Sequence, residues 1–227
     1  MRKMKRSLTA SLSLLLLVAG CSDEATEPIN QPKSEVAEVE TITDPNTEPV
    51  IDTVGNLTSD MAVYDYRYDA MDRGNYEYYA KEVVIDTSYY EENEVARGDV
   101  IAYKETPDDE FNLTRIIALP GEKVKIESGQ IYINEKQLDT FYGRAHRVGL
   151  DLEELKSMLQ EENYSLLQSK ENVESNINDF ENRNVKEVTV PADHVYVIGD
   201  DWFRTTISGP FPIENIAGKV LGYKAEE

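Results

Sequence analysis

Short stretches in which apolar and polar residues alternate dominate the chain from about residue 82 onwards. A period of two places every second side chain on one face of a strand, so each stretch predicts a β-strand. The stretches are EVVID (82–86), GDVIAYK (98–104), LTRIIA (113–118), EKVKIES (122–128), QIYINEK (130–136), EVTVP (187–191), HVYVIGD (194–200) and KVLGYK (219–224). Gly129 separates the fourth from the fifth and indicates a hairpin. We therefore expect a mainly β domain over residues 61–227.

One segment, from residue 151 to about residue 181, departs from this pattern. Its apolar residues recur at helical spacing, which predicts one or two amphipathic helices inserted into the β domain. Asp151, followed three residues later by Glu154, resembles a capping box. The apolar residues are Leu152, Leu155, Leu159, Leu166, Val173, Ile177 and Phe180. The insertion is either a surface element without chemistry or a helix that binds a partner protein, and the sequence leaves both interpretations open.

The first 21 residues have the features of an export signal. MRKMKR (1–6) carries four positive charges and no acid, and the apolar run LSLLLLVAG leads to Cys21. This run is shorter than the roughly 20 apolar residues of a membrane-spanning helix. VAGC (18–21) resembles a bacterial lipobox, which implies that residues 1–20 are removed and that Cys21 is lipidated. A free cysteine beside an ordinary cleavage site is the alternative.

Residues 21–60 have the composition of a tether rather than of a folded domain. From Ser22 to Asp60 the chain has ten acids against one Lys, four prolines and few large apolar residues. Such a segment cannot bury enough apolar surface to offset the entropy lost on ordering. We therefore predict that residues 21–60 form a disordered, acidic tether.

The net charge narrows the classes of partner. It is −21 for the whole chain and −25 without residues 1–20. A surface of this charge repels nucleic acids and anionic lipid headgroups, so we expect no nucleic-acid partner and membrane contact only through the lipid on Cys21. Cys21 is also the only cysteine. The domain therefore has no intramolecular disulfide and no cysteine metal site, and we expect neither a metal nor a cofactor.

Three sequence blocks follow one another in order along the β domain. They are RGDV (97–100), TRIIALPGEKVKIESGQIYIN (114–134), and VPADHVYVIGDD (190–201) with ISGPFPIENIAGKV (207–220). Together they resemble the type I signal peptidase family. The resemblance implies a β-rich fold and a Ser–Lys dyad, with the Ser in a Ser-Met-x-Pro motif and the Lys at the start of the strand that ends in Pro-Gly. In such a dyad a neutral, desolvated Lys amine takes the proton of a Ser that is otherwise a poor nucleophile.

At both dyad positions the chain departs from the family pattern. AMDR (70–73) is the best match to Ser-Met-x-Pro, so Ala70 occupies the position of the nucleophile. Arg115 and the Pro120-Gly121 pair fix the frame of the second motif, so Thr114 occupies the position of the Lys. No intact catalytic residue remains at these positions, and the resemblance therefore implies an inactive relative.

The third block departs from the pattern as well. Of the family's Ser-x-Asp-Ser-Arg run only Ser208 remains, so we expect the Asp–Arg support of the dyad to be missing, with Trp202 packed over the gap. Other polar side chains are interpreted as surface, turn or strand-end residues rather than as replacements. These are His146, His194, Lys81, Lys104, Thr87 and Ser88.

The resemblance also implies a groove in which a signal peptide binds as an added strand, with small pockets for Ala-like side chains. We expect it to be bordered by Asp69, Met71, Asp72, Phe111, Asn112 and Leu113. Our first hypothesis is an extracytoplasmic, lipid-anchored and catalytically inactive relative at the bacterial cell membrane. Its expected partners are signal peptides or a protein of the secretion machinery. The alternatives are an active serine-type signal peptidase with a relocated or misaligned catalytic site, and a structural envelope lipoprotein.

Overall fold

The computed structural model describes residues 39–106 and 108–226. Its helices and strands are β1 (Thr41–Ile42), β2 (Thr53–Val54), β3 (Met61–Tyr66), β4 (Lys81–Asp86), α1 (Tyr89–Glu92), β5 (Val100–Tyr103), β6 (Asn112–Ala118), β7 (Lys123–Glu127), β8 (Gln130–Ile133), β9 (Lys136–Leu138), α2 (Leu152–Gln160), α3 (Lys170–Glu181), β10 (Val185–Thr189), β11 (His194–Ile198), β12 (Ser208–Pro212) and β13 (Ile216–Lys224). The predicted export signal, Cys21 and the tether up to residue 38 lie outside the described residues. Within the described residues, no helix has the length and apolar character needed to cross a membrane.

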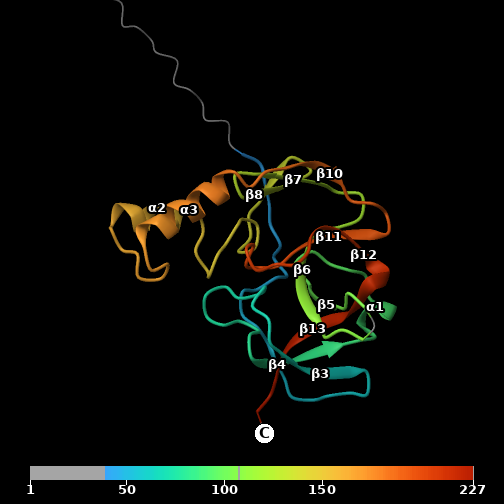
Figure 1. The fold of residues 1–227 in the computed structure, drawn as a ribbon. Coiled ribbons are helices and arrows are strands. Elements are labelled where there is room, and N and C mark those ends of the chain that lie inside the picture. The colour runs from blue at the N-terminus through green and yellow to red at the C-terminus, as the bar shows by residue number, and fades with distance from the viewer. Residues whose placement is uncertain (1–38, 107, 227) are drawn as a thin grey trace, which may run out of the picture. The chain divides into compact units, whose positions relative to one another are not determined.

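Two sheets make up most of the domain (Figure 1). The smaller sheet has the strand order β1-β9-β8-β7-β10, and the larger has the order β12-β11-β6-β5-β13-β4-β3, with β2 paired to β13. Each of the eight predicted stretches overlaps a strand, so the mainly β prediction is confirmed. The alternation did not reveal β12, which contains two prolines. An edge strand tolerates proline because one side of its backbone needs no ladder partner.

The hairpin of β7 and β8 shows how the sequence sets the smaller sheet. Val124 and Ile126 on β7 are buried together with Ile131 and Ile133 on β8, while the residues between them face outward. The connecting turn, Ser128-Gly129, has a positive φ at both positions, 46° and 76°. This is the backbone of the two-residue turn whose twist matches paired strands, and Gly adopts it at little cost.

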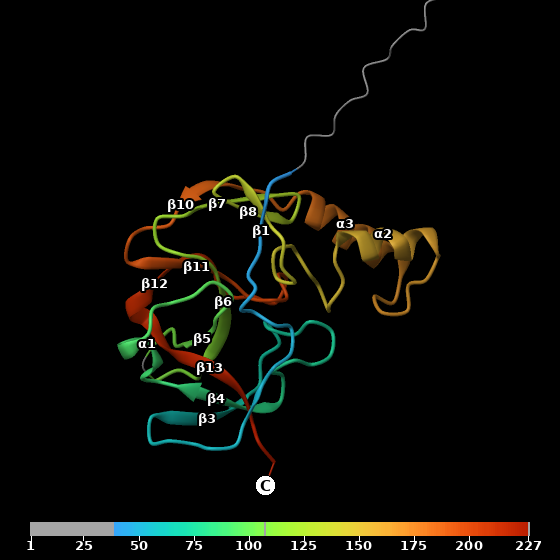
Figure 2. The ribbon, with the colours of Figure 1, turned by 180° about the vertical axis from the view of Figure 1, so that it is seen from behind.

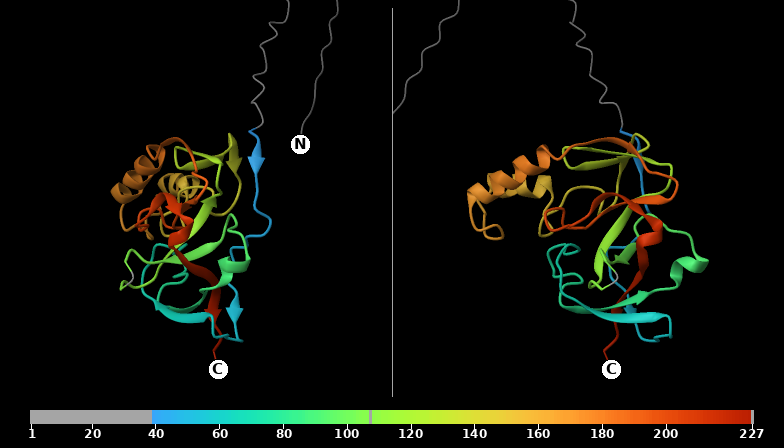
Figure 3. Two further views of the ribbon diagram at one scale, coloured as in Figure 1. Left: turned by 90° about the vertical axis from the view of Figure 1, so that its right-hand side faces the viewer. Right: turned by 45° about the vertical axis from the view of Figure 1, so that its right-hand side comes forward.

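The predicted helical insertion is present as α2 and α3, which lie side by side beyond one end of the smaller sheet (Figure 3). Asp151 caps α2 by accepting from the backbone N–H groups of Glu153 and Glu154, and the Glu154 carboxylate accepts from the Asp151 N–H at 2.8 Å. The predicted capping box is therefore confirmed. Leu166 differs from the prediction: it lies in the segment between the helices and is 68% exposed. The apolar spacing did not register the turn that separates α2 from α3.

The tether prediction is wrong for residues 39–60, because part of this segment pairs with both sheets. We call residues 41–54 the strap. At one end β1 pairs in parallel with β9, and at the other β2 pairs in parallel with β13. Figure 2 shows the strap running from one sheet to the other. These contacts use main-chain groups, such as the Asp139 N–H donating to the Ile42 carbonyl at 2.9 Å, so the polar composition did not reveal them.

Between its two strands the strap is held by side chains and by one glycine. The Tyr142 hydroxyl donates to the Asp44 carboxylate at 2.7 Å, and Arg73 donates to the Pro49 carbonyl. Gly98 has a φ of 86°, and a Cβ there would collide with Thr47 and Asp44. The Gly of the RGD block therefore permits the close approach of the strap.

A buried ion pair between Arg115 and Asp200 connects the blocks that follow. Arg115 on β6 donates from Nε to Asp200 Oδ1 at 2.7 Å and from Nη2 to Oδ2 at 2.6 Å. Its Nη1 donates to the Gly98 carbonyl at 2.8 Å. Both side chains are only 3% exposed. One guanidinium thus holds the RGD block, the central strand and the Gly-Asp-Asp turn after β11 in fixed positions.

The surroundings of Arg115 favour its charged form. Burial would lower the pKa of its guanidinium, but the charge of Asp200 and the hydrogen bonds to it raise that pKa above the usual range. The guanidinium carbon also lies 4.9 Å from the centre of the Phe141 ring and 5.2 Å from that of Tyr142. Such stacking on aromatic faces suits a weakly hydrated guanidinium.

We expect Asp200→Asn to destabilise the domain strongly, because it leaves the Arg115 charge buried without its carboxylate. The loss should be about 3–5 kcal/mol of unfolding free energy in a denaturant titration. Asp193→Asn is the matched control, since Asp193 is exposed and pairs only with its neighbour His194. Equal unfolding midpoints for the two variants would show that the buried pair contributes no net stability.

We also expect Gly98→Ala to displace the strap. Gly121→Ala is the control, because Gly121 has a similar φ of 81° but nothing within 4 Å of its would-be Cβ. Both variants carry a backbone strain of about 1 kcal/mol, whereas only Gly98→Ala adds a steric collision. In limited proteolysis we expect cleavage within residues 41–54 for Gly98→Ala and not for Gly121→Ala. Equal resistance of both variants would contradict the close approach.

Candidate functional site

Ala70, at the position of the expected nucleophile, is held against the turn that contains Asp200. Its carbonyl accepts from the Asp201 N–H at 2.9 Å. A Cβ on Gly199 would come within 2.7 Å of the same carbonyl, so the two backbones are in close contact. Ala70 is 8% exposed, and its side chain reaches the wall of a groove. These contacts fix the position of Ala70, whose side chain is a methyl group without nucleophilic chemistry.

Thr114, at the position of the expected general base, lies on β6 opposite Ile101 of β5. It is 1% exposed and is not part of the groove wall. Among the described residues its hydroxyl has no hydrogen-bond partner. A hydroxyl does not accept a proton near neutral pH as a neutral Lys amine does. Thr114 therefore fills its place in the strand without supplying a base.

The groove beside Ala70 has a volume of about 510 Å³. One wall is formed by residues 68–70 after β3, and the opposite wall by the connection between β5 and β6 and the start of β6. Its lining is rich in carboxylates, and among the described lining residues Arg204 is the only cation. The carboxylates belong to Asp69, Glu105, Asp108, Asp109 and Glu110. The described lining contains no Ser, Cys, His or Lys; its hydroxyls belong to Tyr68 and Thr206, and it has no imidazole or amine that could act as their base.

The start of β6 presents a strand edge in this groove. Arg115 is paired on both sides, with Val100 of β5 and Ile198 of β11, and Ile116 and Ala118 also pair with β11. In the described strands, residues 112–114 pair only with β5. Of these, Asn112 and Leu113 line the groove. An extended segment lying between them and residues 68–70 would therefore meet a strand edge with one side unpaired.

The structure brings only some of the predicted groove residues together. Asp69, Asn112 and Leu113 line the groove as expected. Met71 and Asp72 do not, because Met71 is fully buried in the core under the larger sheet and Asp72 is 4% exposed.

Asp72 instead accepts from two backbone N–H groups of its own loop, those of Gly74 at 2.9 Å and Tyr76 at 2.8 Å. Phe111 packs edge-on against Tyr64, with 5.4 Å between ring centres, and lies beneath the Lys104 amine. The side chains of Met71, Asp72 and Phe111 therefore lie outside the groove lining.

Arg204 provides a support that the sequence analysis did not foresee. It ion-pairs with Asp69 at 3.1 Å, with Asp72 at 3.4 Å and with Asp201 at 3.7 Å. This arginine connects the segment around Ala70 to the Gly-Asp-Asp turn. In the sequence, Arg204 is marked only by its position four residues after Asp200. That position does not identify the carboxylates with which it forms ion pairs.

Asp201 is the most buried member of this network, with a side chain that is 0% exposed. Burial raises the pKa of its carboxyl above the usual value. The backbone N–H groups of Val148 and Phe203 donate to it at 3.0 and 2.9 Å and oppose that rise. The carboxylate thus fixes loop geometry rather than facing the groove.

The remaining candidates lie outside the described groove lining. Ser208 is an exposed residue at the start of β12. The His146 Nδ1–H donates to the Arg144 carbonyl at 2.9 Å, and burial lowers the pKa of the imidazole. His194 is bonded to Asp193 at 2.7 Å.

Among the turn and strand-end residues, the Thr87 hydroxyl donates to the Asp60 carbonyl and the Ser88 hydroxyl to Asp86. Lys81 is exposed at the start of β4. Trp202 is 4% exposed and belongs to the core of the smaller sheet, in agreement with its expected packing role. In the part of the chain that the structure describes, no cluster of three or more His, Cys, Asp or Glu side chains is suited to hold a metal ion.

Comparisons with known proteins place this geometry in a family. The profile of the family described as "Signal peptidase, peptidase S26" matches residues 71–222. "Signal peptidase I U" of Bacillus subtilis (strain 168) is 29% identical over 105 residues, which is 46% of this chain. The match covers 43% of that relative's length, so the chain spans less than half of the curated protein it resembles.

A solved structure, the crystal structure of a signal peptidase I from Enterococcus faecalis V583, is also similar to this chain. It is 22% identical with a TM-score of 0.33, and the match covers 56% of this chain and 97% of the other. The family profile spans well over half of the chain and includes both β6 and the Gly-Asp-Asp turn. The chain therefore belongs to the signal peptidase S26 family.

Proposed function

We propose that this protein is a catalytically inactive member of the family that binds peptides in the groove beside Ala70. The observation that carries the proposal is the chemistry of the two dyad positions. Ala70 offers a methyl group to the groove, and Thr114 is enclosed in the sheet behind it. Loss of the nucleophile alone lowers the turnover of a serine protease by about 10⁶-fold.

Peptide binding is supported by the unpaired start of β6. An extended peptide can add to such an edge through main-chain hydrogen bonds, which do not depend on a nucleophile or a base. Ala70 and Leu113 are apolar residues of the groove lining, and Leu113 also belongs to the core under the larger sheet. The carboxylates of the rim favour peptides that carry positive charge.

The location follows from the predicted export signal. Lipidation of Cys21 would hold the domain at the extracytoplasmic face of a bacterial membrane. A single acyl chain binds membranes only weakly, whereas two chains anchor stably. Signal peptides emerging at that face, or a protein of the secretion machinery, are the partners we propose for the groove.

We expect the full chain to show no peptidase activity. A signal-peptide substrate incubated with it should remain intact over hours, and a fluorophosphonate probe should leave the protein unlabelled, because neither position 70 nor position 114 supplies a reactive group. An active signal peptidase assayed in the same detergent is the control. Turnover that co-purifies with the protein and is lost in a Ser208→Ala or a Thr206→Ala variant would contradict inactivity.

We expect the same full chain to bind a fluorescein-labelled signal peptide, measured by fluorescence anisotropy. Asn112→Trp should weaken binding by about tenfold, because a large side chain at the groove wall blocks the edge of β6. Asn56→Trp is the matched control, since Asn56 is exposed and does not line the groove. Equal affinities of the two variants would argue against this groove as the peptide site.

A further inference from the structure

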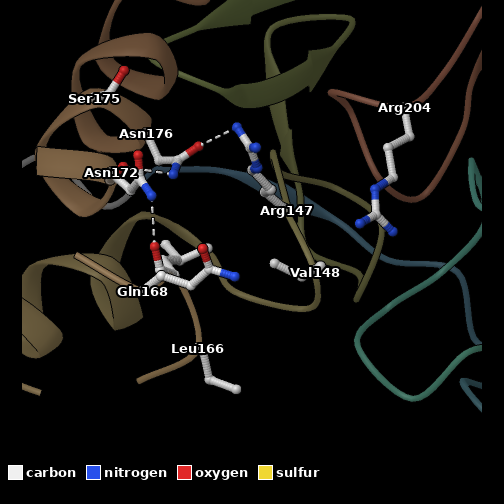
Figure 4. A pocket seen from close by; sticks show the side chains of 9 residues that line it. Arg147, Val148, Leu166, Gln168, Asn172, Ser175, Asn176 and Arg204 are labelled. Carbon is white, nitrogen blue, oxygen red and sulfur yellow. Dashed lines mark hydrogen bonds between the residues drawn. The ribbon is translucent and has the colours of Figure 1, made fainter. Parts of the chain in front are cut away.

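A second cavity, which shares only Arg204 with the groove, lies between the helical insertion and the β domain. Its volume is about 310 Å³, within the lower range of ligand pockets. Figure 4 shows α3 with Asn172 and Asn176 on one side of it and Arg147, Val148 and Arg204 on the other. The proposed peptide binding makes no use of this cavity.

The charge of its lining is unusual for this protein. The chain has 44 acids against 23 basic residues, yet the described lining contains two arginines and no carboxylate. The other polar groups are amides and a hydroxyl, from Gln168, Asn172, Asn176 and Ser175. In a strongly acidic protein such a lining concentrates positive charge and hydrogen-bond donors in one place.

Arg147 is the group that points to a ligand. It is partly buried, and among the described residues no carboxylate lies within 4.0 Å of its guanidinium, in contrast to Arg115 and Arg204. Its Nη1 donates to Asn176 Oδ1 at 2.7 Å, and its guanidinium carbon lies 4.7 Å from the centre of the Phe203 ring. These contacts fix the guanidinium while leaving its other N–H groups available to a ligand.

The opposite wall is held equally firmly. Asn176 is 3% exposed and donates to the Asn172 carbonyl at 2.7 Å, and Asn172 donates to the Leu167 carbonyl at 2.7 Å. These bonds, drawn as dashed lines in Figure 4, hold α3 and the segment before it together as one wall. The pocket therefore does not depend on ligand binding to form.

Two strained residues contribute to the lining. Val148 has a φ of 45° and Gln168 a φ of 69°. A β-branched residue such as Val rarely adopts this conformation, and strain of this kind costs about 1–3 kcal/mol. Val148 is kept there by its N–H bond to Asp201, and a Cβ on Gly74 would come within 2.7 Å of its carbonyl. Strained backbone of this kind is concentrated in ligand sites.

We propose that this cavity binds a carboxylate group. A guanidinium matches the two oxygens of a carboxylate, and Arg147 supplies one that has no carboxylate within 4.0 Å among the described residues. The Gln168 amide and the Ser175 hydroxyl at the rim would donate to the same ligand. Arg204 closes the cavity on the side of the groove, because it lines both. The carboxylate comes either from a free organic acid or from an acidic side chain of a peptide.

Two isosteric pairs of probes test the ligand class and its source. The ¹⁵N-labelled full chain in detergent is titrated with succinate and succinamide, and with N-acetyl-glutamate amide and N-acetyl-glutamine amide. The side-chain N–H signals of Arg147 and Gln168 are followed by NMR. We expect saturable shifts with the acids and none with their amide partners. Tighter binding of succinate identifies a free acid as the source, and tighter binding of the glutamate derivative identifies a peptide.

Variants localise the binding. Ser175→Glu places a carboxylate at the exposed rim, where it competes for Arg147, and should weaken binding of the acid by about tenfold. Ser59→Glu is the control, with the same change at an exposed position outside the cavity. Arg147→Lys keeps the charge and a donor for Asn176 but loses the fork, and should also weaken binding by about tenfold.

Three results would overturn the proposal: absence of saturable shifts, equal shifts with the amides, or tighter binding of inorganic phosphate than of either acid. Unchanged binding in Ser175→Glu would overturn it as well, and this exposed substitution tests the site even if Arg147→Lys proves unstable. Loss of signal-peptide binding alone would bear on the proposed function and not on this cavity.

Discussion

The ion pair between Arg115 and Asp200 is the constraint on which the arrangement of the domain depends. Two desolvated charges are tolerated in a protein interior only when their geometry is good and their remaining hydrogen-bonding groups are satisfied. Here the carboxylate is held by a two-bond fork and the third guanidinium nitrogen by the Gly98 carbonyl. Because Asp200 lies between Gly199 and Asp201, the pair also fixes the turn that holds the Ala70 carbonyl.

This constraint separates the scaffold of the site from its chemistry. The residues that position segment 69–72 are charged and mutually paired, whereas positions 70 and 114 carry small uncharged side chains. Replacement of a serine by alanine removes one hydroxyl and leaves almost the same volume, so the packing around Ala70 does not require a nucleophile. The groove can therefore keep its shape whether or not position 70 carries a hydroxyl. Peptide binding through a strand edge needs only that shape.

The sequence predicted what local patterns determine and missed what depends on distant partners. Alternation located the strands, and the Asp151–Glu154 spacing located the start of α2, because both signals lie within a few residues. The strap was missed because its stability comes from main-chain bonds to β9 and β13, far away in sequence. The three partners of Arg204 were missed for the same reason. Met71 and Asp72 were assigned to the groove by adjacency to Ala70, although a tight loop turns both of them inward.

Thr114 is a buried polar residue whose place in the sheet is not explained by packing alone. Its hydroxyl is buried without a partner among the described residues, and such a group costs about 1–3 kcal/mol of stability. Valine has nearly the same shape and would avoid that cost, so packing alone does not favour threonine here. The neighbouring Arg115, in contrast, satisfies its hydrogen bonds with Asp200 and Gly98. A poorly satisfied polar side chain beside a fully satisfied one marks position 114 as a place where the family scaffold accommodates a polar group that packing does not require.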